Sequence, residues 1–252
     1  MRNSLETILR LRGSGRRPFC SAVVLAAGGS VRMGSDKILA RLGEIPVLAR
    51  TLRPFQNSEC IDEIVVVTSA EKLQEVTELC REYNIGKVSK VVTGGKTRAE
   101  SALTGVSEVN SKAELIAVHD GARPLVTEDL IRRTVQAAAE YRAVVPAIRS
   151  TDTLKTAGAD MAIVGTVDRE TTWRIQTPQV FQAILIKGAL TKAMKQGLPL
   201  TDDSSAMDVI GVKTYIVEGD EENIKLTKPL DLLLAAAILR DRRERDENRP
   251  GL

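Results

Sequence analysis

The stretch Ala22-Val-Val-Leu-Ala-Ala-Gly-Gly-Ser-Val-Arg-Met-Gly-Ser-Asp-Lys37 decides the fold class of this 252-residue chain. A short, apolar, largely β-branched run passes directly into a glycine-rich loop that ends in a lysine. This order is typical of a strand followed by a ligand-binding loop, because ligands of α/β proteins bind outside the carboxyl ends of the strands. The stretch therefore predicts a binding site at this loop.

Outward from this stretch, short β-branched runs alternate with longer stretches of helical periodicity. The predicted strands span residues 22–26, 64–68, 88–92, 115–119, 143–146 and 213–217. The predicted helices span residues 47–55, 71–83, 97–106, 128–141 and 187–194. The alternation predicts an α/β fold with a Rossmann-like, mostly parallel sheet and helices on both faces.

A last helix is expected near the end of the chain. Thr227 is its candidate N-cap, and Pro229 lies in its first turn. Apolar side chains follow at the spacing of a buried helix face: Leu230, Leu233, Leu234 and Ile238. The charged stretch over residues 240–249 is expected to be a solvated helix end that frays.

The alternation breaks between residues 150 and 176. This segment is polar and rich in turn residues, yet it contains Ile163, Val164 and Val167 close together. A segment of this length without a helix is usually functional or packs on another surface. We predict a protruding β-arm that mediates a symmetric homodimer, because its apolar side chains would otherwise be exposed.

The composition excludes several classes of partner. Aromatic residues make up 3% of the chain, which argues against base stacking and hence against nucleic acid. The net charge is +3, but residues 1–20 hold five arginines and one glutamate, so the remainder sums to −1. Any phosphate site must therefore be local. No apolar run approaches the roughly 18 residues of a membrane span, so no membrane association is expected.

The glycine-rich loop has the chemistry of an anion site. Gly28 and Gly29 expose backbone N–H groups that can bind phosphate oxygens, and Arg32 and Lys37 can close over the charge. The patterns GxxxxGK[ST] and GxGxxG are absent, which disfavours a Walker loop and a nicotinamide-binding site. The residues alone leave a second interpretation open, a tight turn with two solvated cations.

Residues 25–37 resemble the LAAGxGxRM…K signature of nucleotidyltransferases that join a nucleoside triphosphate to a phosphorylated small molecule. Six further motifs follow in the order seen in the 2-C-methyl-D-erythritol 4-phosphate cytidylyltransferase family. They span residues 94–101, 119–124, 145–155, 176–181, 201–203 and 222–227. The resemblance covers the chain from Ser21 to about Leu239.

This resemblance implies transfer of a cytidylyl group from CTP to 2-C-methyl-D-erythritol 4-phosphate with Mg²⁺, which gives 4-diphosphocytidyl-2-C-methyl-D-erythritol and pyrophosphate. The attacking phosphate is already ionised near neutral pH, so neither a protein nucleophile nor a strong base is needed. Catalysis then consists mainly of charge neutralisation and alignment. The chain has a single histidine, His119, for which we expect an orienting or packing role.

The resemblance also assigns roles to individual residues. Those that would stabilise the transferring phosphoryl group are Arg32, Lys37 and Lys225. Asp120, at the end of a strand, would contact CTP and bind Mg²⁺, although a turn cap is its alternative role. The other CTP-binding residues would be Ala26, Ala27, Gly28, Gly29, Ser30, Gly95 and Ser101. The residues for the sugar-alcohol phosphate would be Arg123, Thr153, Arg169 and Thr201, with Arg169 reaching the neighbouring subunit's site.

Two positions depart from the family pattern. Ser30 stands where the family usually has glycine, and serine restricts φ, so the loop is expected to have a different shape. Glu222 stands where an aspartate usually precedes Asn-Ile-Lys. The extra methylene moves the carboxylate by about 1 Å, which makes a metal-binding role of Glu222 doubtful.

Three alternative functions stay open at this point. Ribitol-5-phosphate cytidylyltransferase shares most of these motifs, although residues 152–155 and 176–179 favour the methylerythritol enzyme. A molybdopterin nucleotidyltransferase has a loop similar to residues 29–37 but no reason to carry the arm. A non-catalytic nucleotide-sensing module is disfavoured by residues that it would not need together: Arg32, Lys37, Asp120 and Lys225.

The expected organisation is a disordered basic extension over residues 1–20, one nucleotidyltransferase domain over 21–240 and a tail over 241–252. The three cysteines form no CxxC pair, which predicts reduced thiols and a cytoplasmic protein: Cys20, Cys60 and Cys80. The arginine-rich N-terminus is similar in composition to a transit peptide, so plastid targeting stays open.

Overall fold

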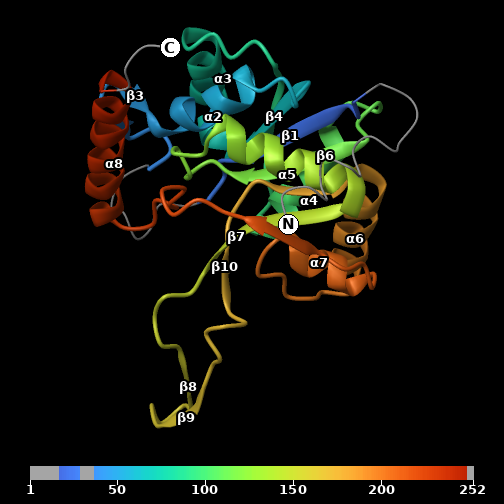
Figure 1. The fold of residues 1–252 in the computed structure, drawn as a ribbon. Coiled ribbons are helices and arrows are strands. Elements are labelled where there is room, and N and C mark those ends of the chain that lie inside the picture. The colour runs from blue at the N-terminus through green and yellow to red at the C-terminus, as the bar shows by residue number, and fades with distance from the viewer. Residues whose placement is uncertain (1–16, 29–36, 249–252) are drawn as a thin grey trace.

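The computed structural model describes residues 17–28 and 37–248. Its central sheet has the strand order β10-β7-β11-β6-β1-β4-β5, with β12 paired to the other edge of β7 (Figure 1). The strands are β1 (Cys20–Leu25), β4 (Glu63–Thr68), β5 (Val88–Thr93), β6 (Leu115–Asp120), β7 (Ala143–Arg149), β10 (Trp173–Ile175), β11 (Gln179–Gln182) and β12 (Tyr215–Glu218). A small hairpin of β2 (Arg41–Leu42) and β3 (Ile45–Pro46) stands apart from it.

The sheet is mostly parallel, as predicted. Strand β1 pairs in parallel with β4 and β6, β4 with β5, and β12 with β7. Strands β10 and β11 run antiparallel to β7, and β11 also runs antiparallel to β6. These two strands were not predicted, because each has only three or four residues and they follow a turn-rich segment.

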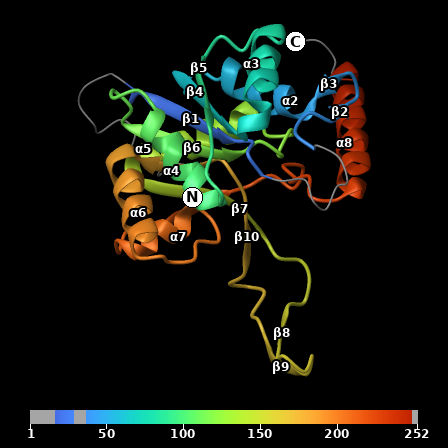
Figure 2. The same cartoon turned by 180° about the vertical axis from the view of Figure 1, so that it is seen from behind.

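Helices cover both faces of the sheet, which confirms the predicted layers (Figure 2). They are α2 (Val47–Asn57), α3 (Leu73–Glu82), α4 (Arg98–Glu108), α5 (Glu128–Tyr141), α6 (Ala183–Lys195), α7 (Ser204–Val209) and α8 (Pro229–Glu247), with a 3₁₀ turn η1 (Ala70–Lys72) before α3. Ala22 and Val24 of β1 pack with α2, α3, α5 and α8, whereas Val23 and Leu25 pack with α4, α6 and α7. The alternation of side chains along a buried strand explains the two cores.

Helix α8 corrects one prediction about its core face. The side chains of Leu230 and Leu233 are each 69% exposed and that of Leu234 is 49% exposed, whereas Ala235 is fully buried. Residues 230–239 are apolar on almost every side of the helix, so spacing alone could not select the buried face. The N-cap is Lys228, one residue after the predicted position.

Helix α8 also continues to Glu247, past the boundary predicted at residue 240. The expected fraying of this end was wrong for its described residues, because Arg242 and Arg245 form ion pairs with Glu222. The predicted extension lies mostly outside the described residues, as do residues 249–252. Arg17, where the description begins, forms an ion pair with Asp62.

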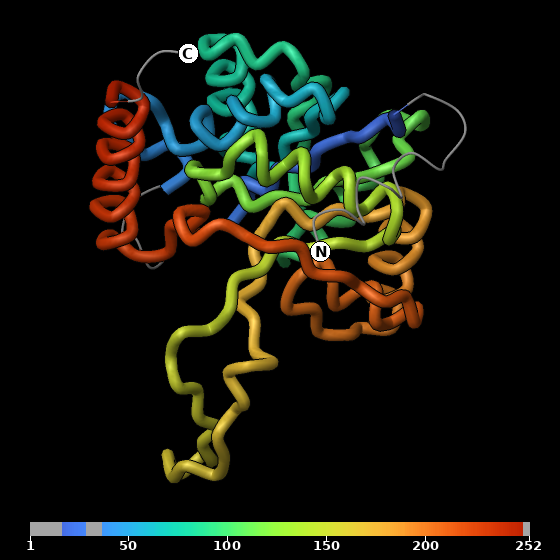
Figure 3. Tube along the Cα trace, viewed as in Figure 1, coloured from blue at the N-terminus to red at the C-terminus, as the bar shows by residue number. Residues whose placement is uncertain are grey.

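The predicted arm is present and projects from the body of the molecule. The chain leaves after β7, forms the antiparallel strands β8 (Lys155–Ala157) and β9 (Ile163–Thr166), and returns at β10 (Figure 3). Near its tip Met161, Ile163 and Val164 are exposed, by 67% or more of their surface. Over the described residues, no helix has both the length and the apolar character that crossing a membrane requires.

Candidate active site

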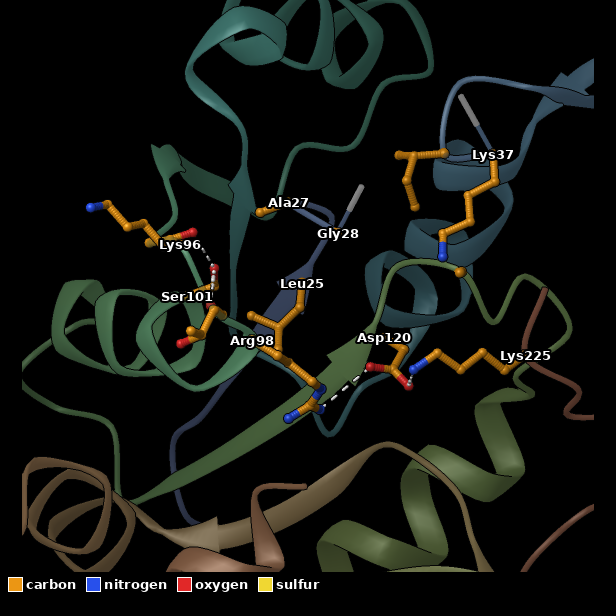
Figure 4. A pocket seen from close by; sticks show the side chains of 13 residues that line it. Leu25, Ala27, Gly28, Lys37, Lys96, Arg98, Ser101, Asp120 and Lys225 are labelled. Atoms are coloured by element: carbon orange, nitrogen blue, oxygen red, sulfur yellow. Dashed lines mark hydrogen bonds and ion pairs between the residues drawn. The ribbon is translucent and has the colours of Figure 1, made fainter. Parts of the chain in front are cut away.

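A cavity of ≈ 200 Å³ lies at the carboxyl ends of β1 and β6, where the first stretch of sequence predicted a site. Its walls come from five parts of the chain: the end of β1, the segment before β2, the start of α4, the end of β6 and the segment before α8 (Figure 4). The lining residues are Leu25, Ala27, Gly28, Lys37, Ile38, Gly95, Lys96, Thr97, Arg98, Ser101, Asp120, Ala122 and Lys225.

Asp120 is the acidic centre of this cavity. Lys225 Nζ lies 2.9 Å from Asp120 Oδ2, Arg98 Nη2 lies 3.4 Å from Oδ1, and Arg123 Nε lies 3.6 Å from Oδ2. Figure 4 shows Arg98 and Lys225 approaching the carboxylate from opposite sides. Burial alone would raise the pKa of Asp120, but the three cations outweigh it and lower that pKa. Asp120 is therefore a carboxylate at neutral pH.

Arg98 is held in place by a second, buried carboxylate. Asp203 is 1% exposed and accepts hydrogen bonds from Arg98 Nη1 at 2.9 Å and from Nη2 at 2.7 Å. Burial alone would lower the pKa of Arg98, but the charge of Asp203 outweighs it and raises that pKa. This two-pronged contact fixes the guanidinium at the cavity wall and leaves one edge turned toward Asp120.

His119 and Arg123 lie beneath the cavity and do not line it. His119 is fully buried, with Nδ1 2.9 Å from Thr177 Oγ1 and its ring 4.9 Å from the Phe55 ring. Burial lowers the pKa of His119 to about 3, so its ring is neutral, which agrees with the predicted packing role. Arg123 is 9% exposed and donates to the Asn223 carbonyl at 2.6 Å.

The turn before α4 brings the backbone of residues 94–97 close to the cavity. A Cβ at Gly95 would lie 2.2 Å from the Cβ of Glu100, and one at Gly94 would lie 2.5 Å from Ser101 Oγ. Only glycine therefore fits at these two positions without displacing α4. Thr97 caps the helix by accepting from the Glu100 N–H at 3.1 Å, which aims the first turn of α4 at the site.

Of the fifteen predicted site residues, twelve lie among the described residues, and the structure brings seven of these together. Seven of them line the cavity: Ala27, Gly28, Lys37, Gly95, Ser101, Asp120 and Lys225. Ala26 is buried beside them, and its N–H donates to the Val67 carbonyl at 2.6 Å. Gly29, Ser30 and Arg32 lie outside the described residues.

Three predicted substrate-binding residues do not reach the cavity of their own chain. Thr153 and Arg169 are exposed on the arm, where Arg169 Nε lies 3.6 Å from Glu170 Oε1. Thr201 precedes α7, and its hydroxyl lies 2.9 Å from that of Ser205. Within one chain, the cavity and the arm are therefore separate regions.

Glu222 has another partner in place of a metal. Arg242 Nε donates to one of its carboxylate oxygens at 2.6 Å, and Arg245 Nη2 donates to the other at 2.6 Å. Burial would raise the pKa of Glu222, but these two bonds outweigh it and lower that pKa. Both carboxylate oxygens of Glu222 are thus bound by arginine, and the doubt about its metal-binding role stays a prediction. Among the described residues, no group of three or more His, Cys, Asp or Glu side chains is arranged to hold a metal ion.

Comparison with known proteins identifies the family. The family model described as 2-C-methyl-D-erythritol 4-phosphate cytidylyltransferase matches residues 20–241, which span the sheet, the cavity and the arm. The chain belongs to this family. It is accordingly an enzyme of the cytidylyltransferase class.

Relatives of this name cover nearly the whole chain. The 2-C-methyl-D-erythritol 4-phosphate cytidylyltransferase of Caldanaerobacter subterraneus subsp. tengcongensis is 42% identical over 87% of this chain and 98% of its own length. That of Halalkalibacterium halodurans is 40% identical over 89% of this chain and 99% of its own length. The crystal structure of the 4-diphosphocytidyl-2C-methyl-D-erythritol synthase of Anaerococcus prevotii superposes with a TM-score of 0.79 and 31% identity, over 89% of this chain and all of that one.

The cytidylyltransferase cavity contains residues that were not predicted from the sequence. Lys96, Thr97 and Arg98 belong to the motif over residues 94–101, but no role was assigned to them. Asp203 belongs to the motif over residues 201–203 and lies behind the wall of the cavity. Their positions within the motifs were the one signal in the sequence that could have marked these residues as part of the site. The pairing of Arg98 with Asp203 is visible only in the fold.

Proposed function

We propose that this chain transfers the cytidylyl group of CTP to 2-C-methyl-D-erythritol 4-phosphate in the non-mevalonate isoprenoid pathway. Family membership carries the proposal, together with a cavity that is lined by Lys37, Arg98 and Lys225, of which Arg98 and Lys225 contact one ionised aspartate. Such a cavity suits a reaction between two phosphate-bearing substrates, in which charge must be neutralised. The family match does not favour ribitol 5-phosphate as the substrate.

In the proposed reaction, an oxygen of the methylerythritol phosphate forms a new bond to the α-phosphorus of CTP. The bond from that phosphorus to the oxygen bridging to the β-phosphate breaks, and pyrophosphate leaves with the bonding electrons. No proton has to move, because the attacking phosphate is already an anion. Lys37 and Lys225 act by neutralising negative charge at the α-phosphate, and Arg32 is assigned the same task.

We propose Mg²⁺ as the cofactor and Asp120 as its protein ligand. Asp120 is the one carboxylate among the described residues that line the cavity, and its lowered pKa keeps it ionised. A single carboxylate fits this ion, because Mg²⁺ usually keeps several waters and takes further oxygens from substrate phosphates. The ion would neutralise part of the triphosphate charge.

Selectivity for a pyrimidine is assigned to the turn before α4. Gly95 and Ser101 lie at the cavity wall, and the glycines of the turn would let its backbone approach a bound base closely. A slot bounded by this backbone would exclude a purine by size, and a site built to hydrogen-bond one base edge rejects others strongly. Ala26, Ala27, Gly28, Gly29 and Ser30 complete the proposed nucleotide site from the first loop.

We propose that the arm completes the site of a second copy of this chain in a homodimer. Thr153 and Arg169 are exposed and far from their own cavity, and the arm tip exposes three large apolar side chains. A C2 dimer would place each arm at the partner's cavity, where Arg169 would bind the phosphate of the second substrate together with Arg123 and Thr201.

Pyrophosphate release with purified protein tests the reaction. CTP with 2-C-methyl-D-erythritol 4-phosphate should give release, whereas CTP with ribitol 5-phosphate, or ATP with the methylerythritol substrate, should give little. Omission of Mg²⁺ should abolish the release. Release with ribitol 5-phosphate alone would contradict the substrate assignment.

Subunit complementation tests the arm. Lys37→Ala and Arg169→Ala should each be nearly inactive, whereas a mixed dimer contains one site with both defects and one with neither. Random exchange makes about half of the dimers mixed, so about a quarter of all sites should recover. If subunits exchange and no activity returns, Arg169 does not act in the partner's site.

A reducing compartment, and so a cytoplasmic location, is proposed from the thiols. Cys20, Cys60 and Cys80 are all free, and burial raises the pKa of Cys80 to about 11. A buried, protonated thiol such as that of Cys80 is unreactive, which fits a protein without a disulfide framework.

A further inference from the structure

Glu222 lies three residues before Lys225 and is bound by the C-terminal half of α8. Arg242 Nε and Arg245 Nη2 each donate to a different carboxylate oxygen at 2.6 Å. The two arginines are three residues apart, so they lie on the same side of the helix. Helix α8 is therefore attached directly to the segment that carries Lys225.

Arg242 has a second contact that Arg245 lacks. Its Nη2 donates to the Leu125 carbonyl at 3.1 Å. Leu125 belongs to the segment that follows Asp120, the last residue of β6. One guanidinium therefore joins the segment that carries Asp120 to the segment that carries Lys225.

The same two segments meet in the cavity through Lys225 and Asp120, whose charged atoms are 2.9 Å apart. Between the cavity and Arg242 they are joined by the Leu226 N–H, which donates to the Ala122 carbonyl at 2.8 Å. The Arg242 side chain joins the same two segments again at Glu222 and Leu125, outside the cavity. It therefore fixes the distance between the two segments from there.

The contact between Arg242 and Glu222 is half-buried and short. The side chains of Arg242 and Glu222 are 23% and 30% exposed, whereas that of Arg245 is 53% exposed. An ion pair with this geometry is stronger than one between freely exposed side chains.

We propose that Arg242, acting through Glu222 and the Leu125 carbonyl, is a positioning residue that sets Lys225 against the transferring phosphoryl group. The inference rests on the proposed role of Lys225 in the reaction. Neither Arg242 nor Glu222 lines the cavity, so neither touches substrate. Their effect is geometric, because a catalytic group displaced by about 1 Å loses up to about 100-fold in rate.

Arg242→Ala and its matched control Arg245→Ala test the proposal, because both remove an arginine from the same carboxylate and only Arg242 reaches Leu125. Arg242→Ala should lower kcat about tenfold or more, with little change in the KM for CTP. Arg245→Ala should change kcat by less than about twofold. Arg242→Lys keeps the charge but replaces two separate donor nitrogens by one ammonium, so it should restore only part of kcat.

Hydrogen exchange at the Leu226 amide supplies a readout that does not depend on activity. Exchange there should be about tenfold faster in Arg242→Ala than in the unmodified chain, and unchanged in Arg245→Ala. Equal exchange in the two variants, or equal kcat, would overturn the proposal. If Arg242→Ala does not fold, Arg242→Lys and Glu222→Gln are compared in the same way, and a kcat for Glu222→Gln equal to that of the unmodified chain overturns it.

A failure of the proposed function is distinguishable from a failure of this inference. If the unmodified chain releases no pyrophosphate from CTP and 2-C-methyl-D-erythritol 4-phosphate, the proposed function fails. The exchange comparison then still decides whether Arg242 fixes the segment before α8.

Discussion

The cavity and the arm differ in how their charged side chains are held. At the cavity Asp120 is surrounded by three cations, and Arg98 is itself fixed by the buried Asp203. On the arm the side chain of Arg169 is 65% exposed, and its Nε lies 3.6 Å from Oε1 of the adjacent, also exposed Glu170. The charged side chains of the cavity are therefore preorganised within one chain, whereas Arg169 on the arm is open to solvent.

The largest effect is expected at the cavity, from Lys225→Ala. Removing this ammonium should lower kcat by about 10² to 10³, because a preorganised charge aimed at the transferring group is lost. Lys195→Ala, at the end of α6 and away from the cavity, is the matched control. Steady-state pyrophosphate release measures both. A Lys225→Ala variant that retains half of the activity would show that the lysine is only a structural partner of Asp120.

A smaller effect on stability is expected from Asp203→Ala. The substitution leaves Arg98 with its fork unpaired beside a buried surface, and breaking such a pair costs about 3 kcal/mol of unfolding free energy. Asp208→Ala, exposed on the same helix, should cost less than about 0.5 kcal/mol. Urea unfolding compares the two variants. Equal costs would mean that the Arg98 fork adds nothing to stability.

His119 predicts a pH dependence of stability. Its pKa is about 3 in the folded chain against 6.5 as a free side chain, so the unfolded chain binds the proton more readily. The neutral His119 ring contributes fully to the free energy of unfolding above pH 6.5. This contribution is lost as the pH falls, by about 2 kcal/mol between pH 7 and pH 5. His119→Gln should remove this part of the slope in urea unfolding at the two pH values. The same slope in both proteins would contradict burial of a neutral ring.

The smallest effect on the body is expected from the arm. Ile163→Ser should change the unfolding free energy of the separated subunits by less than about 0.5 kcal/mol, because this side chain is 67% exposed. The same substitution should weaken dimerisation, measured by sedimentation velocity over a range of concentrations. A large loss of stability in the separated subunits would mean that the arm packs on its own body.

The parts of the fold that sequence predicted are those set by local pattern. The helix over residues 128–141 has the predicted bounds, because Thr127 caps it and Arg142, with φ 68°, ends it. Asp120 and Lys225 were predicted because each lies in an ordered motif. These features need only neighbouring residues to be recognised.

The parts that sequence missed depend on contacts between distant residues. Arg98 and Asp203 are 105 positions apart, and neither position alone indicates the pair. The buried face of α8 was predicted wrongly because apolar residues surround the first half of the helix. The second half forms an ion pair with Glu222, which the sequence alone did not indicate. The substrate role of Arg169 stays a prediction, because one chain cannot place it.

The attachment of α8 has a consequence for ionic strength. Few of its side chains are buried, and the two arginine contacts to Glu222 hold its second half to the body. At about 1 M salt the Debye length falls to about 3 Å, so charges this exposed attract one another much less. Dissolved salt therefore weakens the more exposed Arg245 contact first and the half-buried Arg242 contact less, and it leaves the apolar cores on the two faces of the sheet unscreened.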